Sequence, residues 1–455
     1  MMKTDPFDRV AIISATVLAL VIAIVILFGD QVGVPIVDYG PVGEASQNSS
    51  ISLTFAQPMA RETAEERFSI SPNVEGEITW AGNTLIFQPV ERLTKGETYQ
   101  VTLEEGATNQ SGRATIQDFS WTFEVRESQV LYLGPADTFI KGLWVMPIDG
   151  GEPRPLYQPD YGVIHFAPSP DGSQIAMTVF TEDQLTEILL IDADGSNPQQ
   201  VVDCGDALCG VVDWSPNGDL LAYEKQDIGI SGQLGNYRIW LADLETGDTA
   251  PIFSDNQVLG YGPQWSPDGD RIAFFDSNPA TQAIKVLDRD ELFVMDIPTP
   301  MGKVGSFDPD GERMVYTAIK QVGRQYYPEL RLAELSPDGE NIALFEDGGH
   351  EDQFAVWSPD GEWIAFGRRR LDRQQGGNAI QILLYDVLND EVIRLTEDAQ
   401  YNATELTWDE TSRYLLATRY RLETNSATSE LWLYDMEDGS FERLTENGIA
   451  AQWLP

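Results

Sequence analysis

A short motif returns along the C-terminal three quarters of this chain, and it constrains the fold more than any other feature. Its clearest copy is the stretch at residues 356–366, VWSPDGEWIAF. The Trp-Ser arm favours a β-strand, the Pro-Asp-Gly step favours a tight turn, and the apolar residues that follow favour a second strand. One such hairpin cannot bury its apolar faces alone, whereas several in succession can. The motif therefore predicts an array of β-hairpins that pack on one another.

The spacing of the copies matches a known architectural unit. The aromatic residues that open successive copies stand 51, 42, 50 and 51 residues apart. Each copy is followed by an apolar strand, a loop and two more strand-like segments, and four strands in that length make a β-propeller blade. The aromatic residues are Trp214, Trp265, Phe307, Trp357 and Trp408, and six blades start near residues 162, 208, 260, 303, 352 and 401.

The two ends of this region complement each other. Residues 129–158 contain three strand-like segments without an inner strand before them, whereas residues 450–455 form an inner strand without outer partners. Together they complete a further blade, which removes exposed strand edges. The sequence therefore predicts an all-β propeller over residues 129–455 that has seven blades and is closed by the C-terminal strand. Six or eight blades are the alternatives.

The repeat resembles the TolB-type β-propeller family, whose WD40-like (PD40) repeats carry a Trp/Phe-Ser-Pro-Asp-Gly turn between the first two strands of each blade. The resemblance covers residues 129–455 and is specific for the fold but says little about function. It implies that the turn is structural. We therefore do not expect its aspartates to be ligands: Asp171, Asp268, Asp310 and Asp360.

Residues 48–126 show a different pattern, with apolar residues at every second position and turn residues between short segments. This pattern is typical of a β-sandwich. The region is similar to the bacterial Ig-like domains of S-layer and other surface proteins, which implies a spacer or adhesion module without catalytic residues. The resemblance rests on Phe55-x-x-Pro58-Met59, Gly96-x-x-Tyr99 and Trp121-Thr122-Phe123.

Residues 10–28 form an uncharged run that is about 28 Å long as a helix, and this length matches the core of a bilayer. Lys3 and Arg9 precede the run, and no basic residue follows it until Arg61. The positive-inside rule then places residues 1–9 in the cytoplasm and the bulk of the chain outside, at the cell surface or in the periplasm. A cleaved signal peptide is the alternative. Residues 29–47 are expected to form a linker to the Ig-like domain.

The chain is strongly acidic, with 73 Asp and Glu against 29 Lys and Arg and a formal net charge of −44. Such a surface repels nucleic acid and anionic lipid headgroups, so we expect no nucleic-acid partner. It favours solubility, cation association or basic partners. Adaptation to a saline or acidic medium is an equally good explanation of the acidity.

The two cysteines, Cys204 and Cys209, stand five residues apart. In an oxidising compartment they can close a local disulfide worth about 2 kcal/mol, which agrees with an external location. A redox CxxC motif or a zinc site requires another spacing or further ligands. A loop-stapling disulfide is therefore the prediction, and two free thiols are the alternative.

Catalytic signals are weak. The chain has only two histidines, His165 and His350, and no Gly-x-Ser-x-Gly nucleophile elbow, so a catalytic triad is not indicated. The segment from Asp192 to Asn197 hints at a calcium loop but lacks the glycine that an EF-type loop needs, and a β-turn is the better interpretation. We predict no cofactor and no metal site.

One asymmetry suggests a binding surface. Basic and tyrosine side chains recur in equivalent loops of three consecutive blades, where guanidinium groups beside aromatic rings suit anionic ligands. Solvated loop charges or ion pairs between blades are the alternative interpretation. The candidate residues are Lys320, Arg324, Tyr326, Tyr327, Arg368, Arg369, Arg370, Arg373, Arg419, Tyr420 and Arg421.

These observations predict a membrane-anchored extracytoplasmic docking protein that uses one propeller face to bind a protein or an anionic glycan or envelope polymer. Two other functions stay open. One is a hydrolase that uses carboxylates in the propeller channel, for which a strongly raised carboxyl pKa would be the distinguishing sign. The other is a structural component of a surface layer.

Overall fold

The computed structural model describes residues 33–148, 151–255, 258–290, 294–345, 349–371, 379–422 and 428–455. The chain divides into two compact units, and the division falls between Arg126 and Glu127. The predicted transmembrane segment at residues 10–28 and the predicted cytoplasmic residues 1–9 lie outside the described residues. Within the described ranges, no helix is long and apolar enough to cross a membrane.

The N-terminal unit is a β-sandwich. Its two four-stranded sheets have the strand orders β1-β3-β6-β5 and β2-β8-β7-β4, and the inward residues of β3, at Ile51, Leu53 and Phe55, are buried between them. The strands are β1 (Ile36–Gly40), β2 (Gly43–Ala45), β3 (Ile51–Phe55), β4 (Phe68–Ser71), β5 (Gly76–Ala81), β6 (Thr84–Pro89), β7 (Thr98–Leu103) and β8 (Phe119–Val125), with one short helix, α2 (Arg61–Glu65).

The sandwich begins earlier in the chain than the sequence pattern indicated. Residues 36–45 were expected to belong to a linker, but they form β1 and β2, one in each sheet. β1 pairs with β3, and β2 pairs with β8 in parallel. The Gly- and Pro-rich sequence of these strands lacks a period-two apolar pattern because each one lies at the edge of its sheet and has few inward positions.

The C-terminal unit contains seven four-stranded antiparallel sheets in its described residues, which we number as blades 1 to 7. Blade 1 has the order β36-β9-β10-β11, and the other blades follow chain order. Blade 1 consists of β36 (Ile449–Leu454), β9 (Gln129–Gly134), β10 (Gly142–Pro147) and β11 (Arg154–Tyr157), and blade 2 of β12 (Val163–Pro168), β13 (Gln174–Phe180), β14 (Thr186–Asp192) and β15 (Gln199–Asp203). Blade 3 consists of β16 (Ala207–Trp214), β17 (Leu220–Ile228), β18 (Leu234–Asp243) and β19 (Thr249–Pro251). Blade 4 consists of β20 (Tyr261–Trp265), β21 (Arg271–Asp276), β22 (Ala283–Asp288) and β23 (Val294–Pro298). Blade 5 consists of β24 (Ser306–Phe307), β25 (Arg313–Val322), β26 (Gln325–Glu334) and β27 (Asn341–Ala343). Blade 6 consists of β28 (His350–Trp357), β29 (Trp363–Arg370), β30 (Gln381–Asp386) and β31 (Glu391–Arg394). Blade 7 consists of β32 (Tyr401–Trp408), β33 (Tyr414–Arg421), β34 (Ser429–Asp435) and β35 (Phe441–Glu446).

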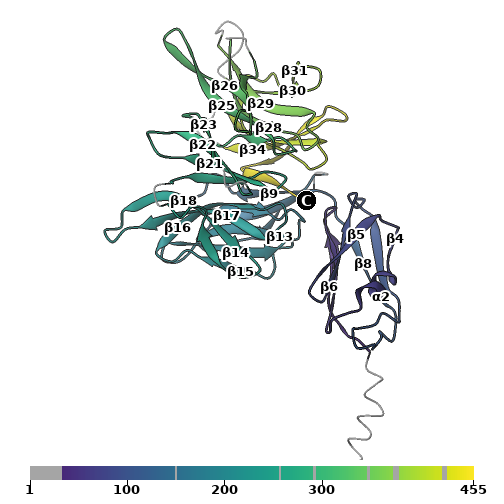
Figure 1. Ribbon diagram of the computed structural model, residues 1–455. Helices are drawn as coiled ribbons and strands as arrows, with labels where there is room; N and C mark the ends of the chain where they lie inside the picture. Colours follow the sequence, from purple (N-terminus) through teal and green to yellow (C-terminus); the bar gives the residue numbers. More distant parts are fainter. Residues whose placement is uncertain are drawn as a thin grey trace, which may run out of the picture. The chain divides into compact units, whose positions relative to one another are not determined.

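The seven blades form a closed ring. β36 pairs antiparallel with β9, so the C-terminal strand is the innermost strand of blade 1, and Figure 1 shows the C-terminus beside β9. Among the described residues, a cluster of buried apolar side chains joins each blade to the next, and the last cluster joins blade 7 to blade 1 through Leu416 and Trp453. The predicted blade number and the predicted closure are confirmed.

The repeated turn is held by its own side chains. In blade 6, Ser358 accepts the backbone N–H of Trp363 at 2.9 Å and donates to Asp360 at 2.5 Å. Gly361 adopts a φ of 75°, which favours glycine. In blade 5, Asp308 replaces the serine and accepts the N–H of Arg313 at 2.9 Å. The turn aspartates thus act within their own turns where their contacts are described, as the resemblance implied.

Cys204, in the connection between blades 2 and 3, forms a disulfide with Cys209 in β16 of blade 3. Both side chains are buried in the cluster that joins these blades. The bond therefore fixes an inter-blade connection, in addition to closing a short loop.

Closure of the ring through β36 can be tested at Trp453. This side chain is buried, and its indole N–H donates to the carbonyl oxygen of Thr407 in blade 7 at 3.3 Å. Trp453→Ala should lower the free energy of unfolding by about 3–5 kcal/mol because it opens a cavity at the seam. The exposed Leu388→Ala is the control and should change it by less than about 0.5 kcal/mol. Equal urea midpoints for Trp453→Ala and wild type would argue against closure at this seam.

Candidate functional site

The propeller has two faces that differ in their loops. One face, which we call the open face, carries the loops between the second and third strands of each blade and the connections between blades. The other, which we call the turn face, carries the Ser-Pro-Asp-Gly turns and the hairpins between third and fourth strands. The candidate basic residues were placed on the open face by the sequence pattern.

Arg368 is not available to a ligand on that face. It lies in β29 with only 9% of its surface exposed. Its Nε and Nη2 donate to the two carboxylate oxygens of Asp352 in β28 at 2.7 and 2.9 Å. Its guanidinium also lies 4.5 Å from the ring centre of Phe345 and 5.2 Å from that of Phe366. A bidentate ion pair stacked between rings is a structural arrangement.

Arg419 occupies the same position in blade 7, as the sixth residue of the second strand. It is 3% exposed, and its guanidinium lies 4.4 Å from the ring of Tyr401 and 4.8 Å from that of Trp432. Asp398 is its nearest carboxylate, at 3.8 Å. Burial lowers the pKa of Arg419, and Asp398 opposes this effect. In blade 3, the sixth residue is Lys225, whose ammonium lies 4.8 Å from the ring of Trp240. A cation over a ring at this position is therefore a recurring packing device.

The other candidates differ in their contacts and in their exposure. Lys320 lies 3.8 Å from Glu329, and Arg369 pairs with Glu351. Tyr327 donates to Gln325, and Tyr420 is half-buried, which raises its pKa. The exposed members are Arg324, Tyr326, Arg370 and Arg421, and Arg373 lies outside the described residues.

Arg368 and Arg419 are therefore buried and do not add to an exposed basic patch, whereas binding at the exposed candidates stays a prediction. Whether a basic side chain near the end of a strand faces solvent or packed side chains depends on the face of the sheet to which it points. At these two positions the side chain faces aromatic rings. The Arg368–Asp352 ion pair lies within blade 6, so it differs from the ion pairs between blades that were the alternative interpretation. Arg419 lies near Asp398 in the connection between blades 6 and 7, which fits that alternative.

A second group of polar side chains joins the inner strands of blades 2, 3 and 4. His165 accepts the backbone N–H of Val212 at 3.3 Å, and Asp213 accepts that of Trp265 at 2.8 Å. Each contact runs from one blade to an inner strand of the next. These side chains thus satisfy backbone groups at places where two sheets meet.

Glu224, in β17, acts in the same way. Its carboxylate accepts the N–H of Gly262 at 2.7 Å and that of Val211 at 3.2 Å. A side chain at Gly210 would displace this carboxylate from its hydrogen bonds, which favours glycine there. Glu224 therefore ties the inner strands of blades 3 and 4 together.

Burial displaces the pKa values of this group. It raises the pKa of Asp213 to about 6, against two backbone hydrogen bonds that lower it, and it raises the pKa of Glu224. It lowers the pKa of His165 to about 4. The histidine is therefore neutral near pH 7. These are the shifts expected of groups that fill polar positions inside a packed structure.

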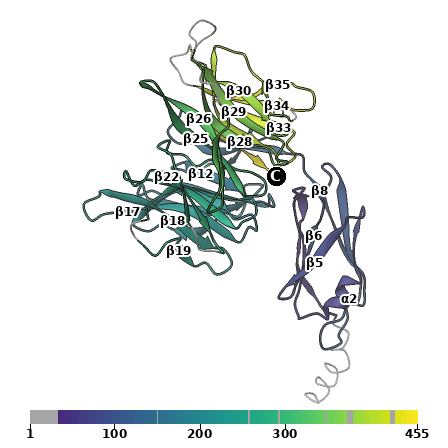
Figure 2. The same cartoon turned by 45° about the horizontal axis from the view of Figure 1, so that its top comes forward.

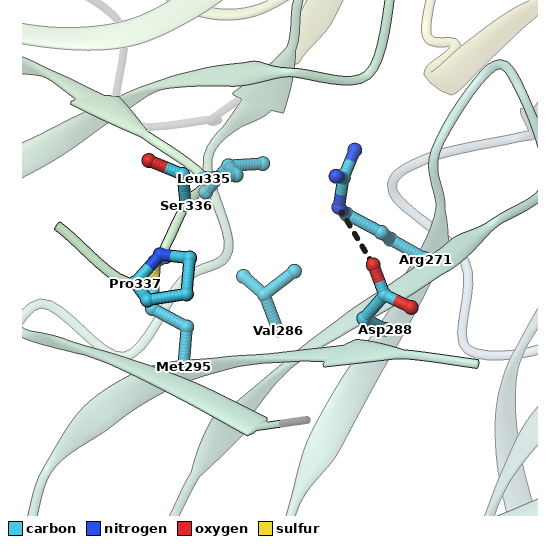
Figure 3. A pocket seen from close by; sticks show the side chains of 7 residues that line it. All are labelled: Arg271, Val286, Asp288, Met295, Leu335, Ser336 and Pro337. Atoms are coloured by element: carbon cyan, nitrogen blue, oxygen red, sulfur yellow. Dashed lines mark ion pairs between the residues drawn. The ribbon is translucent and has the colours of Figure 1, made fainter. Parts of the chain in front are cut away.

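Two cavities formed by the described residues lie on the turn face. One of about 200 Å³ lies between blades 4 and 5 (Figure 3), where Arg271 and Asp288 face Leu335, Ser336 and Pro337 across the space. The Arg271 guanidinium is 3.6 Å from Asp288 and donates to the carbonyl of Gly311 at 2.7 Å, so it already contacts other groups of the protein.

The other cavity, of about 490 Å³, lies between blades 7 and 1 and combines apolar side chains with carboxylates. Its lining includes Ile148, Leu433, Glu127, Asp438 and Glu442. In the residues that the structure describes, no three side chains of the metal-binding types converge to hold an ion. Neither cavity contains His165, Asp213 or Glu224.

Comparison with known families identifies both units. A bacterial Ig-like domain matches residues 36–125, and a TolB beta propeller domain matches residues 181–372. The chain carries a bacterial Ig-like domain followed by a TolB-type β-propeller. This confirms both resemblances drawn from the sequence, and it agrees with the early start of the sandwich at β1.

Individual relatives of the TolB-type propeller are distant. "Uncharacterized peptidase YuxL" of Bacillus subtilis (strain 168) is 22% identical over 285 residues, which are 53% of this chain and 42% of the relative. The chain thus spans less than half the length of that curated relative. Similar solved structures include TolB from Acinetobacter baumannii, with 15% identity, a TM-score of 0.43 and coverage of 86% and 83% of the two chains. Another is an oligogalacturonate lyase from Vibrio parahaemolyticus, with 12% identity, a TM-score of 0.48 and coverage of 70% and 86%.

Sequence reasoning missed two groups of residues in the TolB-type propeller. Asp213 and Glu224 stand among 73 acidic residues, and only the register of neighbouring blades distinguishes them. Exposed apolar side chains on loops, such as Phe139 and Ile230, were also missed. Their signal was present, because apolar residues in short polar loops are unusual.

The structural role of Arg419 can be measured. Arg419→Ala should lower the free energy of unfolding by about 2–4 kcal/mol, because it empties a space between aromatic rings and removes the cation from them. Arg324→Ala, at an exposed hairpin tip, is the matched control and should change it by less than about 0.5 kcal/mol. Equal losses for the two variants in urea unfolding would contradict the assignment.

The raised pKa of Asp213 predicts that the free energy of unfolding depends on pH, and the direction of the shift gives the sign of this dependence. Its pKa is raised from an ordinary 3.8 to about 6, so its contribution to stability is complete below pH 3.8 and is lost as the pH rises through 6. Asp213→Asn keeps the acceptor and removes the charge, so the variant should match wild type near pH 4 and exceed it by up to about 3 kcal/mol at pH 7.

The matched control for this measurement is His165→Gln, which should behave in the opposite sense. The pKa of His165 is lowered from 6.5 to about 4, so wild-type His165 contributes stability above pH 6.5 that is lost as the pH falls to 4. Unfolding free energies measured between pH 4 and 7.5 check both slopes. A pH-independent difference between Asp213→Asn and wild type would contradict the prediction.

Proposed function

We propose that this chain is a membrane-anchored extracytoplasmic docking protein, in which the open face of the TolB-type propeller binds a partner protein. Residues 10–28 serve as the anchor, the Ig-like domain serves as a spacer, and the propeller presents the binding surface. The proposal assigns no chemistry to the chain. It requires an exposed surface that differs from the rest of the propeller.

Two observations support the location. The uncharged run at residues 10–28 follows Lys3 and Arg9 and precedes a long stretch without basic residues, which is the charge pattern of a cytoplasmic N-terminus. The disulfide between Cys204 and Cys209 is typical of an oxidising compartment. Both point to the same side of the membrane.

The difference between the two faces is the observation that carries the docking proposal. In the described part of the propeller, eight of the twelve exposed large apolar side chains lie in the loops, hairpin tips and strand ends of the open face. Of the other four, Leu388 lies on the turn face, and Ile342, Val392 and Ile393 lie in the outer strands β27 and β31. Isolated exposed apolar residues are ordinary, but their concentration on one face indicates an interaction surface. The open-face residues are Phe139, Ile140, Tyr161, Ile230, Leu234, Val322, Tyr326 and Leu422.

Four of these residues lie on two long hairpins. The β17–β18 hairpin carries Ile230 and Leu234, and the β25–β26 hairpin carries Val322 and Tyr326. Figures 1 and 2 both show the two hairpins projecting beyond the blades on the same side of the propeller. Between them lies blade 4, whose second and third strands are shorter. The hairpins therefore form two arms suited to hold a protein surface.

The second candidate is a carboxylate-based hydrolase, and one observation favours it. The raised pKa of Asp213 is the sign expected of a catalytic carboxylic acid. However, the Asp213 carboxylate accepts a backbone hydrogen bond from the next blade and lines neither of the cavities described above. A structural role explains the same shift, so the docking function is the better proposal.

The docking proposal predicts a face-specific partner. A membrane-impermeant crosslinker applied to spheroplasts that carry the full-length chain should capture a protein, and Phe139→Ser/Ile230→Ser/Tyr326→Ser should lower that capture at least tenfold. These side chains are exposed, so the variant should keep the wild-type melting temperature. Leu388→Ser on the turn face is the control and should leave capture unchanged.

Three results would contradict the proposal. Absence of capture in spheroplasts but capture in lysed cells would place the propeller in the cytoplasm. Equal capture by the open-face variant and by Leu388→Ser would remove the open face as the site. Capture of an envelope glycan in place of a protein would change the class of partner.

A further inference from the structure

Three of the exposed apolar residues lie in two adjacent segments near the point where the ring closes, and we name Phe139, Ile140 and Tyr161 the seam patch. Phe139 is 88% exposed, Ile140 51% and Tyr161 37%. The first two lie in the β9–β10 loop of blade 1, and Tyr161 lies in the connection to blade 2. The N–H of Val163 donates to the carbonyl of Lys141 at 2.9 Å, which holds the two segments side by side.

The loop beneath the seam patch is firmly held. The backbone N–H of Ala136 donates to the carbonyl of Asn447 at 2.9 Å, and the Asp137 N–H donates to the Asn447 side chain at 3.0 Å. The Asn447 side-chain amide returns a hydrogen bond to Asp137 at 2.7 Å. Within the loop, the Thr138 hydroxyl contacts the carbonyls of Pro135 and Ile140 at 2.9 and 2.8 Å.

These hydrogen bonds matter because they hold the loop that carries the exposed Phe139. Exposure of a Phe side chain to water is costly, and its burial by a partner contributes more to binding affinity when the loop is already ordered. Ordering a free loop on binding consumes part of the interaction energy, and a loop that is already ordered avoids that loss. Large apolar side chains on a rigid surface are the typical anchors of protein interfaces. Phe139 has both properties.

The surroundings of the seam patch are acidic. Asp137 lies within its loop, Asp160 precedes Tyr161, and Glu182 and Asp183 occupy the next loop, and all four are exposed. The next loop is adjacent because the N–H of Phe180 donates to the carbonyl of Gly162 at 3.1 Å. Lys141 is the basic residue of these segments, and its ammonium donates to the carbonyl of Thr138 at 2.9 Å.

We propose that the seam patch binds a segment of a partner protein that combines apolar side chains with Lys or Arg. Phe139 and Ile140 supply the apolar contact, and the four carboxylates pair with the basic side chains. This inference rests on the docking function proposed above and names the place on the open face and the chemistry of the partner.

Charge complementarity selects this occupant over others. Nucleic acid and anionic lipid headgroups are repelled by four carboxylates around the apolar centre. A second copy of this chain brings another net charge of −44 toward the first, which opposes association. A basic segment with apolar side chains is attracted by the carboxylates and buries Phe139, so both properties of the patch favour it.

The test places a photo-crosslinking amino acid at position 139, 326 or 388 of the full-length chain in its native membrane. We expect position 139 to crosslink to one protein, within a segment that contains apolar residues and Lys or Arg. A synthetic peptide of that segment should bind the full-length chain at least tenfold more weakly when the chain carries Phe139→Ser/Ile140→Ser. Replacing the Lys and Arg of the peptide by Glu should have an effect of similar size.

The outcomes separate this inference from the docking proposal. Crosslinks from position 326 alone would keep the open face as a docking surface and overturn the seam patch. Crosslinks from position 388 alone, or from none of the three positions, would overturn both. A crosslink from position 139 to a lipid, to a second copy of this chain, or to a segment without basic residues would overturn the partner chemistry proposed here.

Discussion

The pairing of β36 with β9 is the contact on which the rest of the propeller depends. It joins residues from opposite ends of the propeller sequence in one sheet, with Trp453 opposite Val130. A ring of blades has as many inter-blade cores as blades only when it closes, and here Trp453 packs with Leu416 in the last of these cores. The same seam places Asn447 under the loop that exposes Phe139. Closure of the fold and rigidity of the proposed docking site thus have one cause.

Polar side chains between the inner strands also join neighbouring blades, closer to the propeller axis. His165, Asp213 and Ser306 each accept a backbone N–H from the next blade. The acceptor can be an imidazole, a carboxylate or a hydroxyl, which indicates that the geometry requires an acceptor and does not require acid–base chemistry. A titratable group recruited for this purpose acquires a displaced pKa because it is buried. Displaced pKa values in this propeller therefore report packing as readily as catalysis.

The features that could be predicted from the sequence are those that are local and periodic. Six blades followed from the spacing of the repeat and the seventh from the complementary ends of the region, and the role of Ser358 and its equivalents followed from turn chemistry confined to a few residues. The strands β1 and β2 were missed because edge strands have little apolar pattern. The surroundings of Arg368 and Arg419 were missed because they are set by tertiary packing of aromatic rings from other segments, to which sequence spacing is only indirectly related.

The buried cations also bear on recognition. A chain with 29 basic residues that buries some of them inside the propeller has fewer left to neutralise its surface. The carboxylates around Phe139 are therefore part of a field that extends over much of the protein and can steer a basic partner from a distance, in a manner that weakens with salt. A partner that relied on charge alone would be attracted to many places on such a surface. Selection among those places must come from apolar contacts, and these are supplied by Phe139 and Ile140.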